Sequence, residues 1–132
     1  MDEKALKSIP LFASLSRSER RQVASWTDEV DVTEGKALVK EGEFAYEVFI
    51  IEEGTAEVVR DGKRVAELGP GDFLGEMGAI RKARRNASVV AKSPMRVVVM
   101  TARDFRRLEH EMSAVAQQIR DAIAARSEVL AG

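Results

Sequence analysis

Apolar and polar residues are distributed in three blocks along the chain. In the first block, residues 1–28, apolar side chains recur at helical spacing on both sides of Pro10, which ends a first short helix. A second helix is expected to begin at Ser16, because a serine followed by Glu19 three residues later forms a capping box. The inner face expected for this helix, with the tryptophan in core packing, is Val23, Ala24 and Trp26.

The middle block, residues 29–101, alternates between short runs rich in valine and isoleucine and turns that contain glycine. The runs expected to form strands are 30–33, 37–40, 46–51, 56–60, 64–68, 87–91 and 96–100. Asp61 and Gly62 stand between two of these runs, and this pair is a strong signal for a tight hairpin. Many short strands at near-regular spacing predict an antiparallel sandwich, barrel or roll.

The third block, residues 102–132, is predicted to be helical. A turn opens at Thr101 or Ala102, with Phe105 and Leu108 facing inward. A long amphipathic helix is expected to follow, and it would dock on the β part or pair with a second copy of itself. Its apolar stripe is Met112, Val115, Ala116, Ile119, Ala122, Ile123, Val129 and Leu130. The chain of 132 residues is therefore predicted to be one mainly β domain with flanking helices.

Composition narrows the classes of function. A net charge of −1 argues against a molecule whose whole surface binds nucleic acid, and the absence of cysteine excludes disulfides and thiolate chemistry. The single histidine, His110, is flanked by charged residues and is expected on a helix surface. Neither a cupin-type metal site nor a Ser-His-Asp triad is then expected, so the chain is predicted not to be an enzyme.

The sequence shows neither a membrane span nor a signal peptide. No run reaches the ~18 to 20 apolar residues that a spanning helix needs. The charged start, MDEKALKSIPLF, lacks the apolar core of a signal peptide. We expect a cytoplasmic protein that contacts neither membrane nor nucleic acid.

The stretch GDFLGEMGAIRKARRNASVV, residues 71–90, concentrates the candidate chemistry. Gly75 lets the backbone approach a ligand closely, and a helical turn over residues 76–79 would offer free N–H groups to an anion. An arginine from the far side of this loop can bind phosphate oxygens through two parallel hydrogen bonds, while Glu76 would accept hydrogen bonds from a ribose. Without a GxxxxGK[ST] motif or clustered carboxylates for magnesium, a nucleotide with a single anionic phosphate is favoured.

These residues resemble the phosphate-binding cassette of cyclic nucleotide-binding domains, as in the catabolite activator protein and the protein kinase A regulatory subunit. The cassette segments here are residues 73–80, FLGEMGAI, and 85–89, RNASV. The first helical segment, the turn glycines Gly35, Gly42, Gly54, Gly62 and Gly71, and the segment 105–108 also resemble the family, so the match covers nearly the whole chain. The resemblance implies a double-stranded β-helix, that is, a jelly-roll-like β-roll with N-terminal helices and C-terminal hinge and lid helices.

The resemblance also implies a role for each cassette residue. Glu76 would bind the ribose 2′-hydroxyl and Arg85 the cyclic phosphate. The other residues implied near the ligand are Gly75, Met77, Gly78, Ala79, Asn86 and Ala87. The family often has proline before the key arginine, and here Arg84 stands at that position; spacing from Gly75 favours Arg85 over Arg84. The neighbouring cations Arg81, Lys82 and Arg84 either form a solvated loop or raise the local positive potential.

The ligand implied is cyclic AMP rather than cyclic GMP, since Asn86 replaces the threonine associated with cyclic GMP preference. No cofactor or metal is expected. The residues implied as a purine cap on the lid helix are Arg126, Val129 and Leu130. The signal would pass through movement of that helix to an effector protein, to a homodimer partner, or to a part of a larger protein. The alternative is a degenerate, ligand-free fold that acts as an interaction or dimerisation module through the stripe at 112–130.

Overall fold

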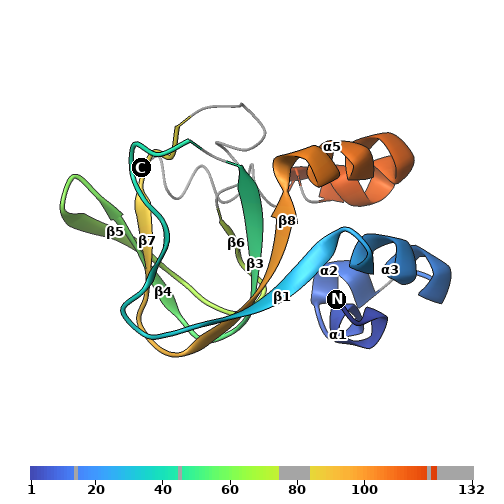
Figure 1. Cartoon of the computed structure of the whole chain (residues 1–132), viewed down its shortest axis with the longest axis horizontal. Helices are drawn as coiled ribbons and strands as arrows, with labels where there is room; N and C mark the ends of the chain where they lie inside the picture. The colour runs from blue at the N-terminus through green and yellow to red at the C-terminus, as the bar shows by residue number, and fades with distance from the viewer. Residues whose placement is uncertain (14, 45, 75–83, 119, 122–132) are drawn as a thin grey trace.

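The protein is described here by a computed structural model that places residues 1–121 except 14, 45, 75–83 and 119 (Figure 1). The helices before the sheets are α1 (Glu3–Lys7), α2 (Pro10–Ala13) and α3 (Arg17–Ala24). The strands are β1 (Thr27–Val32), β2 (Ala37–Val39), β3 (Glu47–Glu53), β4 (Ala56–Arg60), β5 (Lys63–Leu68), β6 (Phe73–Leu74), β7 (Ser88–Ala91) and β8 (Met95–Thr101). Helix α5 (Ala102–Glu111) follows, and residues 113–118 are again helical.

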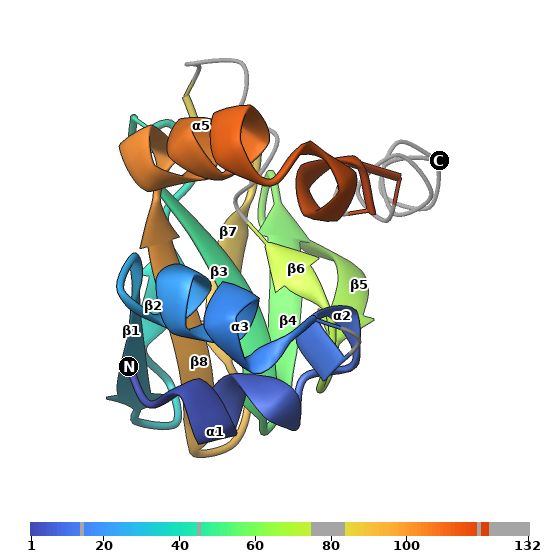
Figure 2. The ribbon, with the colours of Figure 1, turned by 90° about the vertical axis from the view of Figure 1, so that its right-hand side faces the viewer.

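The strands form two four-stranded antiparallel sheets. One sheet has the order β1-β8-β3-β6 and the other the order β2-β7-β4-β5. The helices gather beside the first sheet, and the second sheet lies on the side away from them (Figures 1 and 2). The predicted fold class, mainly β with helices on both sides in sequence, is confirmed.

The apolar run of β3 explains how the two layers are held together. Val48 and Ile50 belong to a core cluster shared with the helices, whereas Phe49 and Ile51 belong to a second cluster inside the β-roll. Successive side chains of a strand point to opposite faces, so an unbroken apolar run indicates a strand that is buried on both sides. All four of these residues are at most 8% exposed. β3 therefore separates the core beside the helices from the core inside the roll.

Two local signals in the sequence produce the expected structure. Ser16 caps α3, and both hydrogen bonds of a capping box with Glu19 are present. Asp61 and Gly62 join β4 to β5 with φ values of 53° and 77°. Positive φ at both central residues is the requirement of a type I′ hairpin turn. Both elements depend on contacts between near neighbours, which is why a sequence pattern predicts them.

At three element ends the structure adds detail to the expectations from the sequence. The first short helix, α1, ends before Pro10 as expected, and Pro10 also begins α2, because proline suits the first helical position. β6, with two residues, was not predicted. The segment expected as a turn from Ala102 is the ten-residue helix α5; it ends at its C-cap Met112, with φ −137° and ψ 61°, and the chain changes direction there (Figure 2). The interruption lets Met112 and Val115 join the same buried cluster as Leu108.

Candidate functional site

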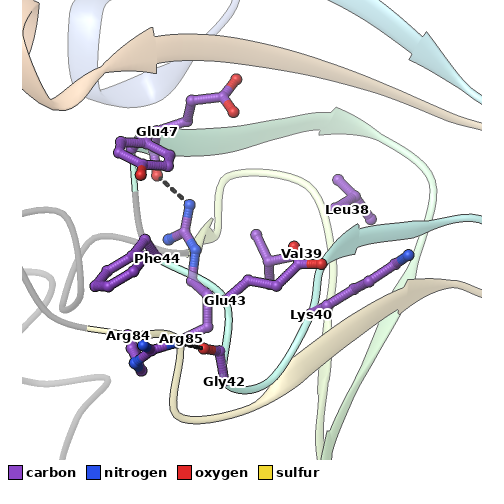
Figure 3. Close-up of a pocket in the computed structure, with 10 residues that line it drawn as sticks. Leu38, Val39, Lys40, Gly42, Glu43, Phe44, Glu47, Arg84 and Arg85 are labelled. Atoms are coloured by element: carbon purple, nitrogen blue, oxygen red, sulfur yellow. Dashed lines mark hydrogen bonds between the residues drawn. The ribbon is translucent and has the colours of Figure 1, made fainter.

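A cavity of about 430 Å³ lies between the segment that joins β2 to β3 and the segment that precedes β7. Figure 3 shows its lining, with the Arg85 side chain pointing towards the start of β3. The residues described in its wall are Leu38, Val39, Lys40, Gly42, Glu43, Phe44, Tyr46, Glu47, Arg84 and Arg85. This volume falls within the roughly 300–1,000 Å³ of small-molecule sites.

Arg85 is the buried cation of this cavity. It is only 8% exposed, and its guanidinium donates a hydrogen bond of 2.9 Å to the main-chain carbonyl of Glu47. Its own backbone is held on both sides, since its N–H donates to the Glu43 carbonyl at 2.7 Å and its carbonyl accepts from the Gly42 N–H at 2.9 Å. A charged side chain is buried at low cost only where hydrogen bonds orient it. The site therefore holds a fixed guanidinium at the cavity wall.

Arg84 also lines the cavity but lies on its exposed side. Its guanidinium sits 4.1 Å from the centre of the Phe44 ring and donates to the Gly42 carbonyl at 2.8 Å. Phe44 and Arg84 also form an isolated antiparallel bridge. The two adjacent arginines thus have different surroundings, one buried in the wall and one stacked on an aromatic ring.

The described lining has more positive than negative charge. Lys40, Arg84 and Arg85 provide three cations, against the two carboxylates of Glu43 and Glu47. Guanidinium groups bind phosphate oxygens through paired hydrogen bonds. Within the part of the chain that the structure describes, no group of three or more His, Asp or Glu side chains is placed to hold a metal ion. The chemistry of the cavity suits a small anion.

The predicted site residues are placed unevenly. Arg85 lines the cavity, whereas Ala87 is buried in the interior of the roll at 6% exposure and Asn86 is exposed. The Asn86 carbonyl accepts a hydrogen bond of 3.2 Å from the Arg60 Nε. The other predicted residues lie outside the described residues: Gly75, Glu76, Met77, Gly78, Ala79, Arg81, Lys82, Arg126, Val129 and Leu130.

Sequence reasoning missed the aromatic side of the cavity. Phe44 and Tyr46 are 54% and 68% exposed, and their ring centres are 6.5 Å apart. The signal available was an aromatic-x-aromatic pair in a turn, one residue before a strand that is already apolar on both faces. Both rings line the cavity, and Phe44 also stacks against Arg84.

A short backbone route connects this cavity to the C-terminal helix. The Tyr46 carbonyl accepts a hydrogen bond of 2.7 Å from the N–H of Ala102, the first residue of α5. The next residue, Glu47, is the carbonyl partner of the Arg85 guanidinium and pairs with Thr101 across β3 and β8. The start of β3 therefore touches both the buried arginine and the beginning of the helix.

Comparison with known proteins identifies the family. Residues 29–111 match the cyclic nucleotide-binding domain. The chain belongs to this family. It is 33% identical over 107 residues to the cAMP-dependent protein kinase regulatory subunit of Schizosaccharomyces pombe, a match that covers 80% of the chain and 26% of that relative. The chain spans only about a quarter of the length of the curated relatives it matches.

Two solved structures share this architecture over about nine tenths of the chain. The Thermus thermophilus catabolite activator protein superposes with a TM-score of 0.78 at 25% identity, over 90% of this chain and 58% of that one. The regulatory subunit of a cAMP-independent protein kinase A from Trypanosoma brucei superposes with a TM-score of 0.74 at 27% identity, over 89% of this chain and 45% of that one. This fold therefore also occurs in the regulatory subunit of a kinase described as cAMP-independent. The choice of ligand has to be argued from the site residues.

No helix among the described residues has both the length and the apolar composition required to cross a membrane.

Proposed function

We propose that this cyclic nucleotide-binding domain is a sensor of cyclic AMP, with cyclic GMP as the weaker ligand. The observation that carries the proposal is the placement of Arg85. It is a buried guanidinium in the wall of a cavity of about 430 Å³, at the sequence position where the family cassette has its phosphate-binding arginine. A cyclic phosphate presents two exocyclic oxygens, and the planar guanidinium suits paired hydrogen bonds to them.

The rest of the ligand would be bound by the cassette. Glu76 accepts hydrogen bonds from the ribose 2′-hydroxyl, and the backbone near Gly75 and Ala87 completes the phosphate cradle with N–H donors. In this proposal Met77, Gly78 and Ala79 would pack beside the cradle, and Asn86 would lie next to the phosphate. Arg126, Val129 and Leu130 are proposed to close over the purine.

The proposed output is a change in the C-terminal helices. Arg85 and Ala102 are hydrogen-bonded to the neighbouring carbonyls of Glu47 and Tyr46. A phosphate that engages Arg85 would alter this pair of contacts and shift the population of α5 positions. The domain performs no chemistry on its ligand in this proposal, and the reader of the signal is an effector protein or a second copy of the chain.

One observation favours the alternative, a ligand-free interaction module. The Arg85 guanidinium already has a structural partner in the Glu47 carbonyl, so its burial does not by itself require a phosphate. Against this alternative, the described beginning of the apolar stripe is covered within the chain. Met112, Val115 and Ala116 are 9%, 5% and 0% exposed and pack against the helices and the first sheet. These three residues are therefore not an open surface for a partner.

The test is a calorimetric titration of the purified protein with cyclic AMP, cyclic GMP and 5′-AMP. Mass spectrometry first establishes that no nucleotide is carried through purification. The variant is Arg85→Lys, which keeps the charge but loses the fork of donors. Arg64→Lys is the matched control, because Arg64 is an exposed arginine on β5 whose side chain is 57% accessible.

We expect cyclic AMP to bind most tightly, and Arg85→Lys to weaken it by roughly 10- to 100-fold, as for a charge-assisted hydrogen bond. Arg64→Lys should bind like the wild type. Thermal unfolding of both variants checks that the fold is kept. If the folded, nucleotide-free wild type gives no heat with any of the three ligands, the sensor proposal is wrong and the interaction module takes its place.

A further inference from the structure

Arg85 lies in no strand, yet its backbone is fixed. Residues 84–85 follow the segment 75–83, and β7 begins only at Ser88. The positions of the two arginines depend on the loop before β3. The Arg85 N–H and carbonyl bond to Glu43 and Gly42 at 2.7 Å and 2.9 Å. The preceding residue, Arg84, adds its guanidinium bond of 2.8 Å to the Gly42 carbonyl.

Phe44 adds a side-chain contact to the bonds that hold Arg84 and Arg85 against the loop before β3. The Arg84 guanidinium lies 4.1 Å from the centre of the Phe44 ring, and the two residues are bridge partners in the backbone. A guanidinium plane stacks on an aromatic face through both its charge and its π system, which a lysine ammonium cannot reproduce. Phe44 is 54% exposed, so its ring does not serve the core of the roll.

The stack between Arg84 and Phe44 restrains the backbone position of Arg84. Arg84 precedes the buried arginine and has two soft backbone dihedrals, unlike a proline, whose φ is fixed by its ring. The backbone of Arg85 itself is bonded to Gly42 and Glu43, so a restraint on Arg84 adds to these bonds. The Phe44 ring and the Gly42 carbonyl together fix the Arg84 side chain, and through it the direction in which Arg85 enters the cavity.

We infer that Phe44 is a positioning residue for the anion site: by stacking on Arg84 it orients Arg85 for a phosphate. The link to ligand affinity rests on the proposed function, whereas the orientation of Arg85 does not. Phe44 also lines the cavity, so direct contact with the ligand is the rival role. The two roles differ in the ligand-free protein, where only a positioning residue changes the behaviour of Arg85.

The first experiment therefore needs no ligand. Amide hydrogen exchange is measured by NMR in the wild type, in Phe44→Leu, and in Phe44→Tyr, which keeps the aromatic face. We expect the Gly42 and Arg85 amides to exchange about two- to fivefold faster in Phe44→Leu, the equivalent of one exposed cation–π contact. Phe44→Tyr should restore the wild-type rates. The amide of Lys92, bonded to the Thr55 carbonyl at 2.9 Å, is the internal control and should not change.

The second experiment measures cyclic AMP affinity by calorimetry in Phe44→Leu, Arg84→Gln and the double variant. We expect Phe44→Leu to weaken binding by about two- to fivefold and Arg84→Gln by at least as much, because it also loses the bond to the Gly42 carbonyl. The double variant should lose no more than Arg84→Gln alone, because that substitution already removes the stack. Arg64→Gln, the loss of one exposed arginine on β5, should leave affinity unchanged and so excludes a general effect of charge.

Each outcome decides the inference. Unchanged exchange at Gly42 and Arg85 in Phe44→Leu overturns it, and weaker binding in that case assigns Phe44 to direct ligand contact. Faster exchange with unchanged affinity overturns it as well, since the orientation would then have no consequence. If the wild type binds no nucleotide, the proposed function fails, and faster exchange in Phe44→Leu still supports Phe44 as the residue that orients Arg85.

Discussion

The guanidinium of Arg85 donates a hydrogen bond of 2.9 Å to the main-chain carbonyl of Glu47, a residue 38 positions earlier in the chain. The neighbouring carbonyl, that of Tyr46, accepts from the Ala102 N–H at 2.7 Å. One peptide unit at the start of β3 thus separates the buried arginine from the first residue of α5. In the proposed function, a phosphate in the cavity would compete with the Glu47 carbonyl for the same donors.

This relationship predicts a ligand-dependent change at the start of α5. On saturation with cyclic AMP, we expect amide exchange at Ala102 to change by severalfold as the Tyr46–Glu47 peptide adjusts. The Lys92 amide, which bonds to Thr55 at the far side of the roll, should stay constant. NMR-detected exchange measures both in one sample. In Arg85→Lys, tested at a saturating ligand concentration, the change at Ala102 should disappear; if it persists, the signal reaches α5 by another route.

The carboxyl group of Glu52 should make the stability of the fold depend on pH. It lies in β3 where the register with β8 shifts, and its Oε1 is buried without a hydrogen-bond partner among the described residues. Burial is the main cause that raises the pKa of Glu52 to about 7. A hydrogen bond with Glu29 and charge repulsion from Glu29 and Glu53 raise it further, whereas the positive charge of Arg96 lowers it. A carboxyl whose folded pKa is raised stabilises the fold while it is protonated.

The stabilisation from Glu52 is therefore complete below the unfolded value of 4.5 and is lost as pH rises from there through about 7. We expect Glu52→Gln to stabilise the protein by about 1 kcal/mol at pH 8, a figure reduced for the partial exposure of the group, and to have little effect at pH 4.5. Urea unfolding at both pH values measures this. Glu34→Gln, in an exposed turn, is the control. An equal effect of Glu52→Gln at both pH values would contradict the assignment.

Gly54 joins β3 to β4 with φ 91°, and a Cβ at this position would overlap the Pro94 carbonyl oxygen and lie 2.9 Å from the Met95 Cα. We expect Gly54→Ala to destabilise the fold by roughly 2–4 kcal/mol, from backbone strain and a clash with main chain that cannot move aside. Gly35→Ala is matched in strain, with φ 89°, but meets no atom within 4 Å. Denaturant unfolding should show a clearly smaller loss for Gly35→Ala; equal losses would mean that the clash is relieved.

Loss of the N-cap residue Ser16 should have a smaller effect on stability, confined to the start of α3. Its hydroxyl accepts from the Glu19 N–H at 3.1 Å, and the Glu19 carboxylate accepts from the Ser16 N–H at 2.9 Å. We expect Ser16→Ala to lower the free energy of unfolding by about 1 kcal/mol, the usual effect of losing an N-cap. Ser18→Ala, inside the same exposed turn of α3, should change stability little. The prediction fails if thermal and urea unfolding do not separate the two variants.

The cassette illustrates which part of the candidate site can be predicted from a sequence motif. Arg85 is identifiable because its neighbours in sequence, Asn86 and Ala87 with the strand after them, form a local motif. The arginine's partners come from the loop before β3 and from the first residue of β3, some 38 to 43 positions away. Nothing near Phe44 in the sequence indicates that its ring will lie under Arg84, because that contact exists only once β3 and the segment before β7 are brought together.

In the C-terminal region, too, local features can be predicted from the sequence, whereas long-range packing cannot. Thr101 caps α5 as its sequence suggests, with its side chain accepting from the Asp104 N–H at 3.1 Å. The interruption at Met112 is invisible in the apolar stripe, because residues 108, 112 and 115 have helical spacing whether or not the helix is continuous.

The sequence by itself determined the elements that near neighbours decide: the capped helix at Ser16, the hairpin at Asp61, most strands and the cassette that marks the family. Each depends on dihedral preferences or hydrogen bonds within a few residues, so the information is local. The tertiary structure alone decided which faces are buried, where the C-terminal helix breaks and which groups meet at Arg85. Those features follow from packing two sheets and a helical layer around β3, and such long-range contacts leave no periodic signal along the chain.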